Sequence, residues 1–178
     1  MKVCVGIKSE PPTMRKTIMV IVENRFGVLA RVAGLFSARG FNIESLSVAR
    51  NTDPTISQMT VVVDVDEAVH AQILKQLAKL VDTIEVTDLS DQPAVARELV
   101  LVKVKPTADQ RVELLKEAEI FRAKVVDVGP ASFVLELTGD EEKISGFLRL
   151  IEKYEVEQVV RTGKVAMARG ARSVECTA

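Results

Sequence analysis

Hydrophobic positions in the first half of the chain alternate between strand spacing and helix spacing. Residues 17–23 are a β-branched run of strand length, and apolar residues then recur at helical spacing over residues 28–36 until Gly40 ends the pattern. Residues 59–65 alternate as a half-buried strand does, and Asp66 is placed to cap a helix after them. The expected order is strand, helix, strand, strand, helix, strand, over residues 17–23, 28–36, 42–49, 59–65, 69–80 and 83–89.

The second half repeats this order after residues 90–96, which contain Pro93 and resemble a short linker. Thr107 and Gln110 predict a capping box, and Asp140 predicts the cap of a later helix. The α-helix after the capping box is expected to bury a stripe of Val112, Leu115, Ala118 and Phe121. The expected segments are 99–104, 112–121, 124–128, 133–137, 144–151 and 156–161, with a basic tail over 163–172.

Two consecutive βαββαβ units predict an α+β fold of the ferredoxin-like type, in which both helices cover one face of a four-stranded antiparallel sheet. The first ordered strand is expected near Lys16, and a slip in alternation between Ile43 and Leu46 predicts a bulge in the second strand. Small cores leave sheet edges and apolar surface uncovered, so a dimer formed by the first unit is expected. The expected divisions are a flexible extension over 1–15, units over 16–92 and 97–172, and a tail over 173–178.

The composition disfavours several classes of function. Lys and Arg number 24 against 25 Asp and Glu, and this balance argues against a nucleic-acid binder. The single histidine, His70, is expected at the surface or its boundary and leaves little room for a histidine metal site or general base. The chain has neither a phosphate-binding glycine motif nor a C-x-x-C pair, so catalytic chemistry is not expected.

The ends of the chain carry its only cysteines, Cys4 and Cys176. Secreted disulfide frameworks are denser than this, which favours a reducing cytoplasm. No apolar run approaches the roughly 20 residues of a membrane span, and residues 1–13 do not form a secretory signal. We therefore expect a cytoplasmic protein with no membrane partner.

The segment between the first strand and the first helix has the chemistry of a small-ligand site. Gly27 permits close approach of a ligand to the backbone, and the helix start that follows presents N–H groups that favour an anion. Asn24 and Asn42 supply amides, and Ile43 is apolar. Together these groups suit a zwitterion with an aliphatic side chain, although plain turn and cap chemistry explains the same residues.

Residues 23–48 read E-N-x-x-G-V-L-x-R-V-x-G-L-F-x-x-R-G-F-N-I-E-S-L-x-V. This run resembles the amino-acid-binding ACT domain of acetolactate synthase small subunits, the regulatory subunits of acetohydroxyacid synthase. The resemblance continues through residues 75–80, 97–98, 120–127 and 161–170, so it covers both units. It favours the ligand-site interpretation over plain turn chemistry.

The resemblance implies a subunit without a catalytic centre, whose large partner subunit holds thiamine diphosphate, Mg²⁺ and FAD. It implies activation of that subunit and feedback inhibition by a branched-chain amino acid, commonly valine, in a site between two ACT domains of a homodimer. The residues that this implies for the effector site are Asn24, Phe26, Gly27, Val28 and Leu29 of one chain, with Asn42 and Ile43 of its neighbour. The alternative is a stand-alone ACT-type amino-acid sensor that regulates another enzyme, and an enzyme in its own right is the least favoured.

Overall fold

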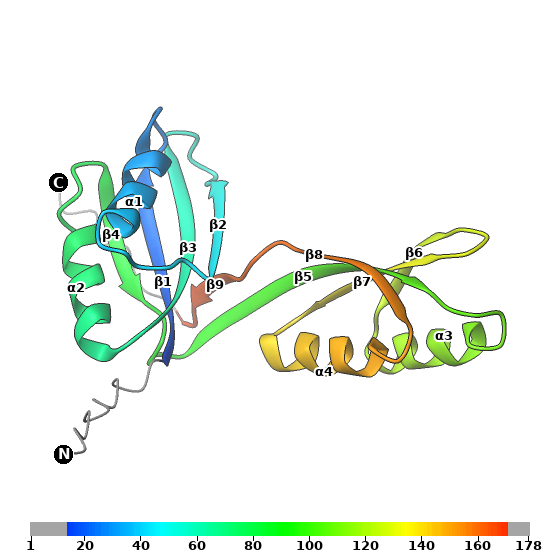
Figure 1. Ribbon diagram of the computed structural model, residues 1–178. Helices are drawn as coiled ribbons and strands as arrows, with labels where there is room; N and C mark the ends of the chain where they lie inside the picture. The colour runs from blue at the N-terminus through cyan, green and yellow to red at the C-terminus, as the bar shows by residue number, and fades with distance from the viewer. Residues whose placement is uncertain (1–13, 171–178) are drawn as a thin grey trace, which may run out of the picture. The chain divides into compact units, whose positions relative to one another are not determined.

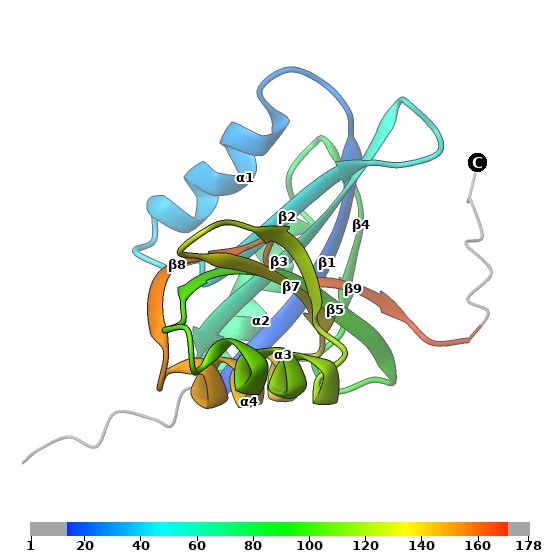
Figure 2. The same cartoon turned by 90° about the vertical axis from the view of Figure 1, so that its right-hand side faces the viewer.

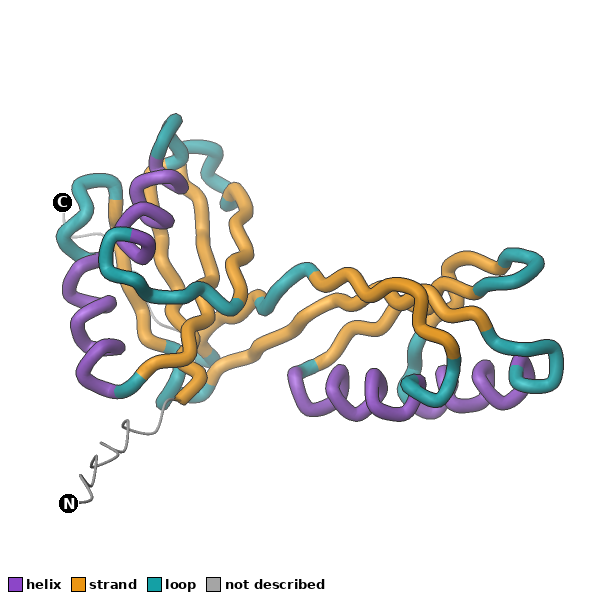
Figure 3. Tube along the Cα trace, in the orientation of Figure 1, coloured by secondary structure: helices purple, strands orange, loops and turns teal. Residues whose placement is uncertain are grey.

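The computed structural model describes residues 14–170, which form two compact units that divide between Gln92 and Pro93 (Figure 1). Each unit has a βαββαβ order with two helices on one face of an antiparallel sheet (Figure 3), which confirms the predicted α+β fold class. Cys4, Cys176 and the terminal tail lie outside the described residues.

The first unit contains a sheet in the order β2-β3-β1-β4, and all of its strand pairs are antiparallel. The core lies between this sheet and the two helices, and β1 and β3 contribute alternate residues to it. The elements are β1 (Met14–Glu23), α1 (Val28–Ser37), β2 (Ser45–Arg50), β3 (Ile56–Val65), α2 (Glu67–Leu77) and β4 (Thr83–Asp88).

Two strand boundaries in this unit differ from those expected. β1 begins at Met14 rather than near Lys16, because Met14 pairs with Val65 at the far end of β3. β2 begins at Ser45 rather than at residue 42, and its register against β3 is continuous from Ser45 to Arg50, so the predicted bulge was wrong. The slip in alternation instead marks the loop before the strand.

The predicted cap of α2 is confirmed, because the Asp66 side chain accepts a hydrogen bond from the Val69 backbone N–H over 2.8 Å. His70 was predicted at the surface, and this was wrong: its exposed fraction is only 1%. Its Nε2 lies 3.4 Å from Asp88 Oδ2 and its Nδ1 lies 3.7 Å from Glu67 Oε1. Carboxylates on α2 and β4 thus lie near the imidazole, but His70 Nε2 is buried without a hydrogen-bond partner, which makes its burial costly.

The second unit contains a sheet in the order β6-β7-β5-β8, and a short ninth strand pairs with β5. Figure 2 shows α3 and α4 on the same side of these strands. The elements are β5 (Ala94–Lys105), α3 (Arg111–Ile120), β6 (Lys124–Val128), β7 (Phe133–Gly139), α4 (Glu141–Ile151), β8 (Glu155–Arg161) and β9 (Val165–Ala168).

The ninth strand was not predicted. Val165–Ala168 pairs with the start of β5, from Ala94 to Arg97, so neither the expected linker over 90–96 nor the expected basic tail from 163 is wholly irregular. Gly163 turns the chain with a φ of +81°, a conformation that glycine adopts readily. The basic residue Lys164 pairs with Glu141 over 3.2 Å instead of standing in an unstructured tail.

The stripe predicted for α3 is confirmed at Ala118, which is buried, and at Phe121, which packs partly buried against the core, but it was wrong at Val112 and Leu115, which are 62% and 42% exposed. Leu114, outside the predicted stripe, is buried instead. One of the two hydrogen bonds of the predicted capping box is present, since the Gln110 side chain accepts a hydrogen bond from the Thr107 backbone N–H. Buried positions four apart, rather than three, set the inward face of this short helix.

Candidate functional site

A glycine with a left-handed backbone conformation precedes the first helix. Gly27 has a φ of +84°, in the left-handed region that side chains with a Cβ rarely adopt, and α1 starts at the next residue. The helix has no side-chain cap and no acidic residue in its first turn. Its N-terminal N–H groups therefore form a positive helix end with room for an anion close to the backbone.

Asn24 fixes the loop that leads to this helix. Its Nδ2 donates to the Pro54 carbonyl oxygen over 2.9 Å, and its backbone N–H donates to the Thr55 carbonyl over 2.6 Å. The side-chain bond uses the amide nitrogen, which leaves the amide oxygen as the atom suited to accept a hydrogen bond from a ligand ammonium.

A hollow of about 500 Å³ lies beside this loop. Phe26 and Leu29 are exposed and Val28 is buried at 3%, and none of these three side chains lines the hollow. The residues that line the hollow are Glu23, Asn24, Arg25, Pro54, Thr55, Ile56 and Ile84. Of the predicted effector residues, one chain thus places Asn24 in the wall of the hollow and the others outside its lining.

Asn42 and Ile43 lie in the loop after α1, at the opposite end of the helix from Gly27. A helix of ten residues spans about 15 Å, so one chain does not bring the two groups of predicted residues together. The Asn42 amide nitrogen donates to Glu44 Oε1 over 2.9 Å, and Ile43 packs partly against the core. A site that uses both loops therefore needs a second chain.

Arg31, to which the sequence pattern assigned no role, lies against the Gly27 loop. A Cβ placed on Gly27 would be 3.5 Å from Arg31 Nη1. The Nε of Arg31 donates to Asp82 Oδ2 over 2.7 Å, and the Asp82 carboxylate is only 9% exposed. The spacing of four residues from Gly27 puts Arg31 one helical turn along the chain, and Arg31 is also a specified position of the run over residues 23–48.

The strongest charge cluster of the first unit lies elsewhere, near His70. Lys16 is 4% exposed, and its Nζ lies 2.8 Å from Glu67 Oε2. The hydrogen bond that the Lys16 ammonium donates to Glu67 raises the pKa of Lys16 and lowers the pKa of Glu67. These groups stabilise charge within the fold and contact none of the residues predicted for the effector.

The described part of the chain, residues 14–170, contains no cluster of three or more His, Cys, Asp or Glu side chains that could hold a metal ion. Within the same residues, no helix is both long and apolar enough to cross a membrane. The chemistry that the described residues offer near Gly27 is that of hydrogen bonds, the guanidinium groups of Arg25 and Arg31, the Glu23 carboxylate and apolar contact.

Comparison with known families matches both units separately. Residues 18–85 match the AHAS small subunit-like ACT domain, and residues 97–170 match the small subunit of acetolactate synthase. The two matches cover the first and the second βαββαβ unit.

Similar proteins cover nearly the whole chain. The acetolactate synthase small subunit of Aquifex aeolicus is 48% identical over 158 residues, which are 88% of this chain and 82% of the relative. The corresponding protein of Haemophilus influenzae is 43% identical over 162 residues, covering 90% and 99% of the two chains. Among solved structures, the acetolactate synthase small subunit of Thermotoga maritima superposes with a TM-score of 0.81 at 36% identity, and the match covers 89% of this chain and 99% of that one.

Proposed function

The chain belongs to the family of acetolactate synthase small subunits, and from that membership we propose that it activates the catalytic large subunit and makes it sensitive to a branched-chain amino acid. The observation that carries the proposal is the pair of family matches, one on each unit. The family identifies a regulatory subunit with an ACT domain, and it implies partnership with the catalytic large subunit. The resemblance predicted from residues 23–48 is confirmed at this level.

The proposal assigns no catalytic step to this chain. Thiamine diphosphate, Mg²⁺ and FAD would be held by the large subunit, which would carry out the carbon–carbon bond formation in the cytoplasm. The chain would act on that reaction only through its contacts with the large subunit.

Valine is the first candidate for the effector. Its carboxylate would meet the N–H groups at the start of α1, beside Gly27, and its ammonium would donate to the Asn24 amide oxygen. Phe26, Val28 and Leu29 would supply the apolar side of the site, with the exposed Phe26 and Leu29 able to contact the ligand directly.

Asn42 and Ile43 would come from a second copy of the chain. The support for this arrangement is the length of α1, which separates the two loops within one chain. A homodimer through the first unit would bring the α1 start of one copy to the loop after α1 of the other. The effector would then lie across the dimer interface and order it on binding.

Regulation requires that the effector bind one state of the complex better than another, because equal affinity for both states shifts nothing. A coupling free energy of about 1–3 kcal/mol corresponds to a roughly five- to 150-fold change. Effector binding at the first unit would reach the large subunit through the second unit, which we propose makes the activating contact. Each unit has its own hydrophobic core, which supports this division of roles.

A stand-alone ACT-type amino-acid sensor is the alternative. Calorimetric titration of the full chain with L-valine, L-leucine and L-isoleucine tests the effector, and a chain truncated after Leu89 tests the division of roles. We expect the truncated chain to bind the same amino acid and to activate the large subunit less than the full chain does. Full activation by the truncated chain would contradict that division.

A further inference from the structure

Arg31 and Asp82 form a fixed pair directly beside the predicted effector loop. Arg31 Nε donates to Asp82 Oδ2 over 2.7 Å, and the Arg31 side chain remains 49% exposed while the Asp82 carboxylate is 9% exposed. Asp82 is itself held in place, because its carbonyl oxygen accepts a hydrogen bond from the Glu23 N–H over 2.9 Å at the end of β1. The guanidinium therefore starts from a position that the fold determines.

The bond to Asp82 uses only one of the donors on the guanidinium. A guanidinium has five N–H donors in a planar fork, and Nε carries one of them. The Nη1 atom is on the side of Gly27, 3.5 Å from the place where a Cβ of that residue would lie. A Cβ there would be in ordinary van der Waals contact with Nη1, so the guanidinium lies directly against Gly27, and the 49% exposure of the Arg31 side chain leaves its outer edge accessible to a ligand atom.

We propose that Arg31 binds the carboxylate of the effector amino acid, and that Asp82 is the positioning residue that orients Arg31 for this contact. This inference rests on the proposed function and adds to it the residue that recognises the acid group. The N–H groups at the start of α1 would meet the same carboxylate from the other side. The ligand class is then a free α-amino acid, and its carboxamide, which lacks the negative charge, is discriminated against.

The half-buried setting favours a strong contact. Hydrogen bonds in which both partners are charged are roughly twice as strong as neutral ones. Asp82 also lowers the conformational entropy that Arg31 loses when the ligand binds, because the Arg31 side chain is already held at its Nε. The Asp82 carboxylate contacts Nε, so a ligand carboxylate would approach the side of the guanidinium that carries the two Nη groups.

The test measures, for the full chain, how strongly each variant prefers an acid to its amide. Calorimetric titrations would give dissociation constants for L-valine and L-valinamide, with the leucine and isoleucine pairs measured in the same way. We expect the wild-type chain to prefer the acid by at least about tenfold, as the loss of a charged hydrogen bond implies. In Arg31→Gln this preference should fall by about tenfold or more, and in Arg31→Lys, which keeps the charge, by less. Asp82→Asn retains the Arg31 residue but removes the charge that orients it, so this variant should also prefer the acid less strongly than the wild-type chain does.

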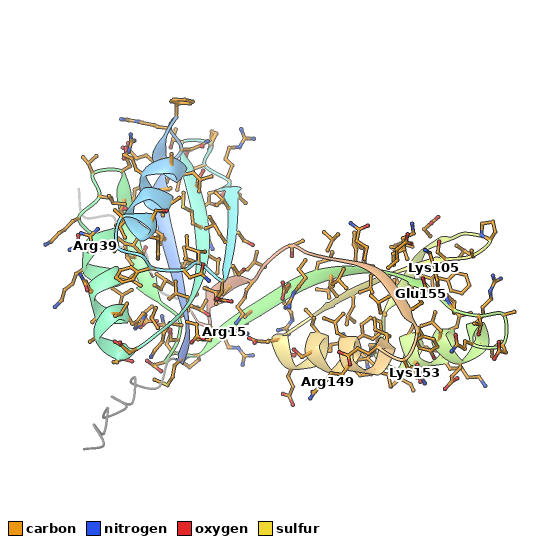
Figure 4. The ribbon with its side chains drawn as sticks, viewed as in Figure 1. Arg15, Arg39, Lys105, Arg149, Lys153 and Glu155 are labelled. Atoms are coloured by element: carbon orange, nitrogen blue, oxygen red, sulfur yellow. The ribbon has the colours of Figure 1, made fainter. Side chains whose placement is uncertain are left out.

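Arg149 provides the control. It is an exposed arginine on α4 of the second unit, labelled in Figure 4. Arg149→Gln removes the same charge from the chain outside the predicted effector site, so it should keep the wild-type preference for the acid. Circular dichroism melting curves would establish that each variant is folded.

The outcomes separate this proposal from the proposed function. If Arg31→Gln weakened valine and valinamide equally, or left both unchanged, the contact with the carboxylate would be refuted while the effector itself stood. If the folded wild-type chain bound none of the three amino acids, the proposed effector class would fail and this inference with it. A reduced acid preference in Arg149→Gln as well would assign the effect to general charge and also refute the specific role of Arg31.

Discussion

Tyr154 donates its hydroxyl hydrogen to Glu117 Oε2 over 2.7 Å, which joins the loop after α4 to α3. Lys153, labelled in Figure 4, lies 2.5 Å from the other oxygen of the same carboxylate. Tyr154 is only 3% exposed, and it is the only tyrosine in a chain without tryptophan. Burial first, and then the bond to Glu117, raise the pKa of the Tyr154 hydroxyl to about 12.

The titration of Tyr154 can be followed directly, because phenolate absorbance in this chain comes from one residue. We expect a midpoint near pH 12 in the folded chain, and a midpoint near the ordinary value of 10 in strong urea. Since the folded state holds the proton more tightly, the stability that this group contributes is complete below pH 10 and is lost as the pH rises through about 12.

The Glu117→Gln variant serves as the control for that titration. It should lower the Tyr154 pKa only part of the way toward 10, because burial is the larger cause of the shift. A midpoint that is already at 10 in the folded wild-type chain would contradict the buried, hydrogen-bonded placement of this tyrosine.

Burial of His70 predicts a second measurable effect. His70→Ala removes a side chain that is 1% exposed, and the cavity should destabilise the first unit by about 2–4 kcal/mol. Gln72→Ala, at an exposed position of the same helix, should change stability by about 0.5 kcal/mol or less. Urea unfolding followed by circular dichroism reports both units, while Tyr154 fluorescence reports only the second, so a transition seen by dichroism alone belongs to the first unit. Equal effects of the two substitutions would place His70 at the surface.

Gly27 allows a charge test of the predicted effector site. Asn and Asp both tolerate the left-handed backbone that Gly27 adopts at a φ of +84°, so Gly27→Asn and Gly27→Asp have a similar shape and differ in charge. In a complex with the large subunit, Gly27→Asp should require at least about tenfold more valine for half inhibition than Gly27→Asn, because its carboxylate repels the ligand and competes for Arg31.

Gly170 is the matched position for this pair of variants. It has a φ of +88° in the second unit, and a Cβ on it would meet no atom within 4 Å. Gly170→Asp should therefore keep the valine concentration for half inhibition of the wild-type complex. Unchanged valine inhibition in both Gly27 variants would place the effector site elsewhere.

Local signals predicted those parts of the fold that depend on neighbours in the sequence. The Asp66 cap, the turn at Gly27 and the four strands of each unit followed from spacing over a few residues. β9 was missed because four residues form a strand only when the distant start of β5 pairs with them. His70 was misplaced because its burial depends on the packing of α2, which places it 3.4 Å from Asp88 of β4, far from it in the sequence.

The same distinction holds at the candidate site. Gly27 and Asn24 were identifiable because they precede a predicted helix, and the roles of Asn42 and Ile43 stay predictions that depend on a second chain. Arg31 escaped notice because its partner, Asp82, is 51 residues away in the sequence. A pair of this kind becomes visible only when the chain folds.

The rate of acetolactate formation from pyruvate by the catalytic large subunit tests the central claim most directly. The rate would be measured for the large subunit alone, for this chain alone, and for the mixture with and without valine, leucine or isoleucine. We predict no turnover by this chain alone, a higher rate for the mixture than for the large subunit alone, and inhibition of the mixture by at least one of the three amino acids. A rate that this chain does not raise, and that none of these amino acids lowers, would contradict the account.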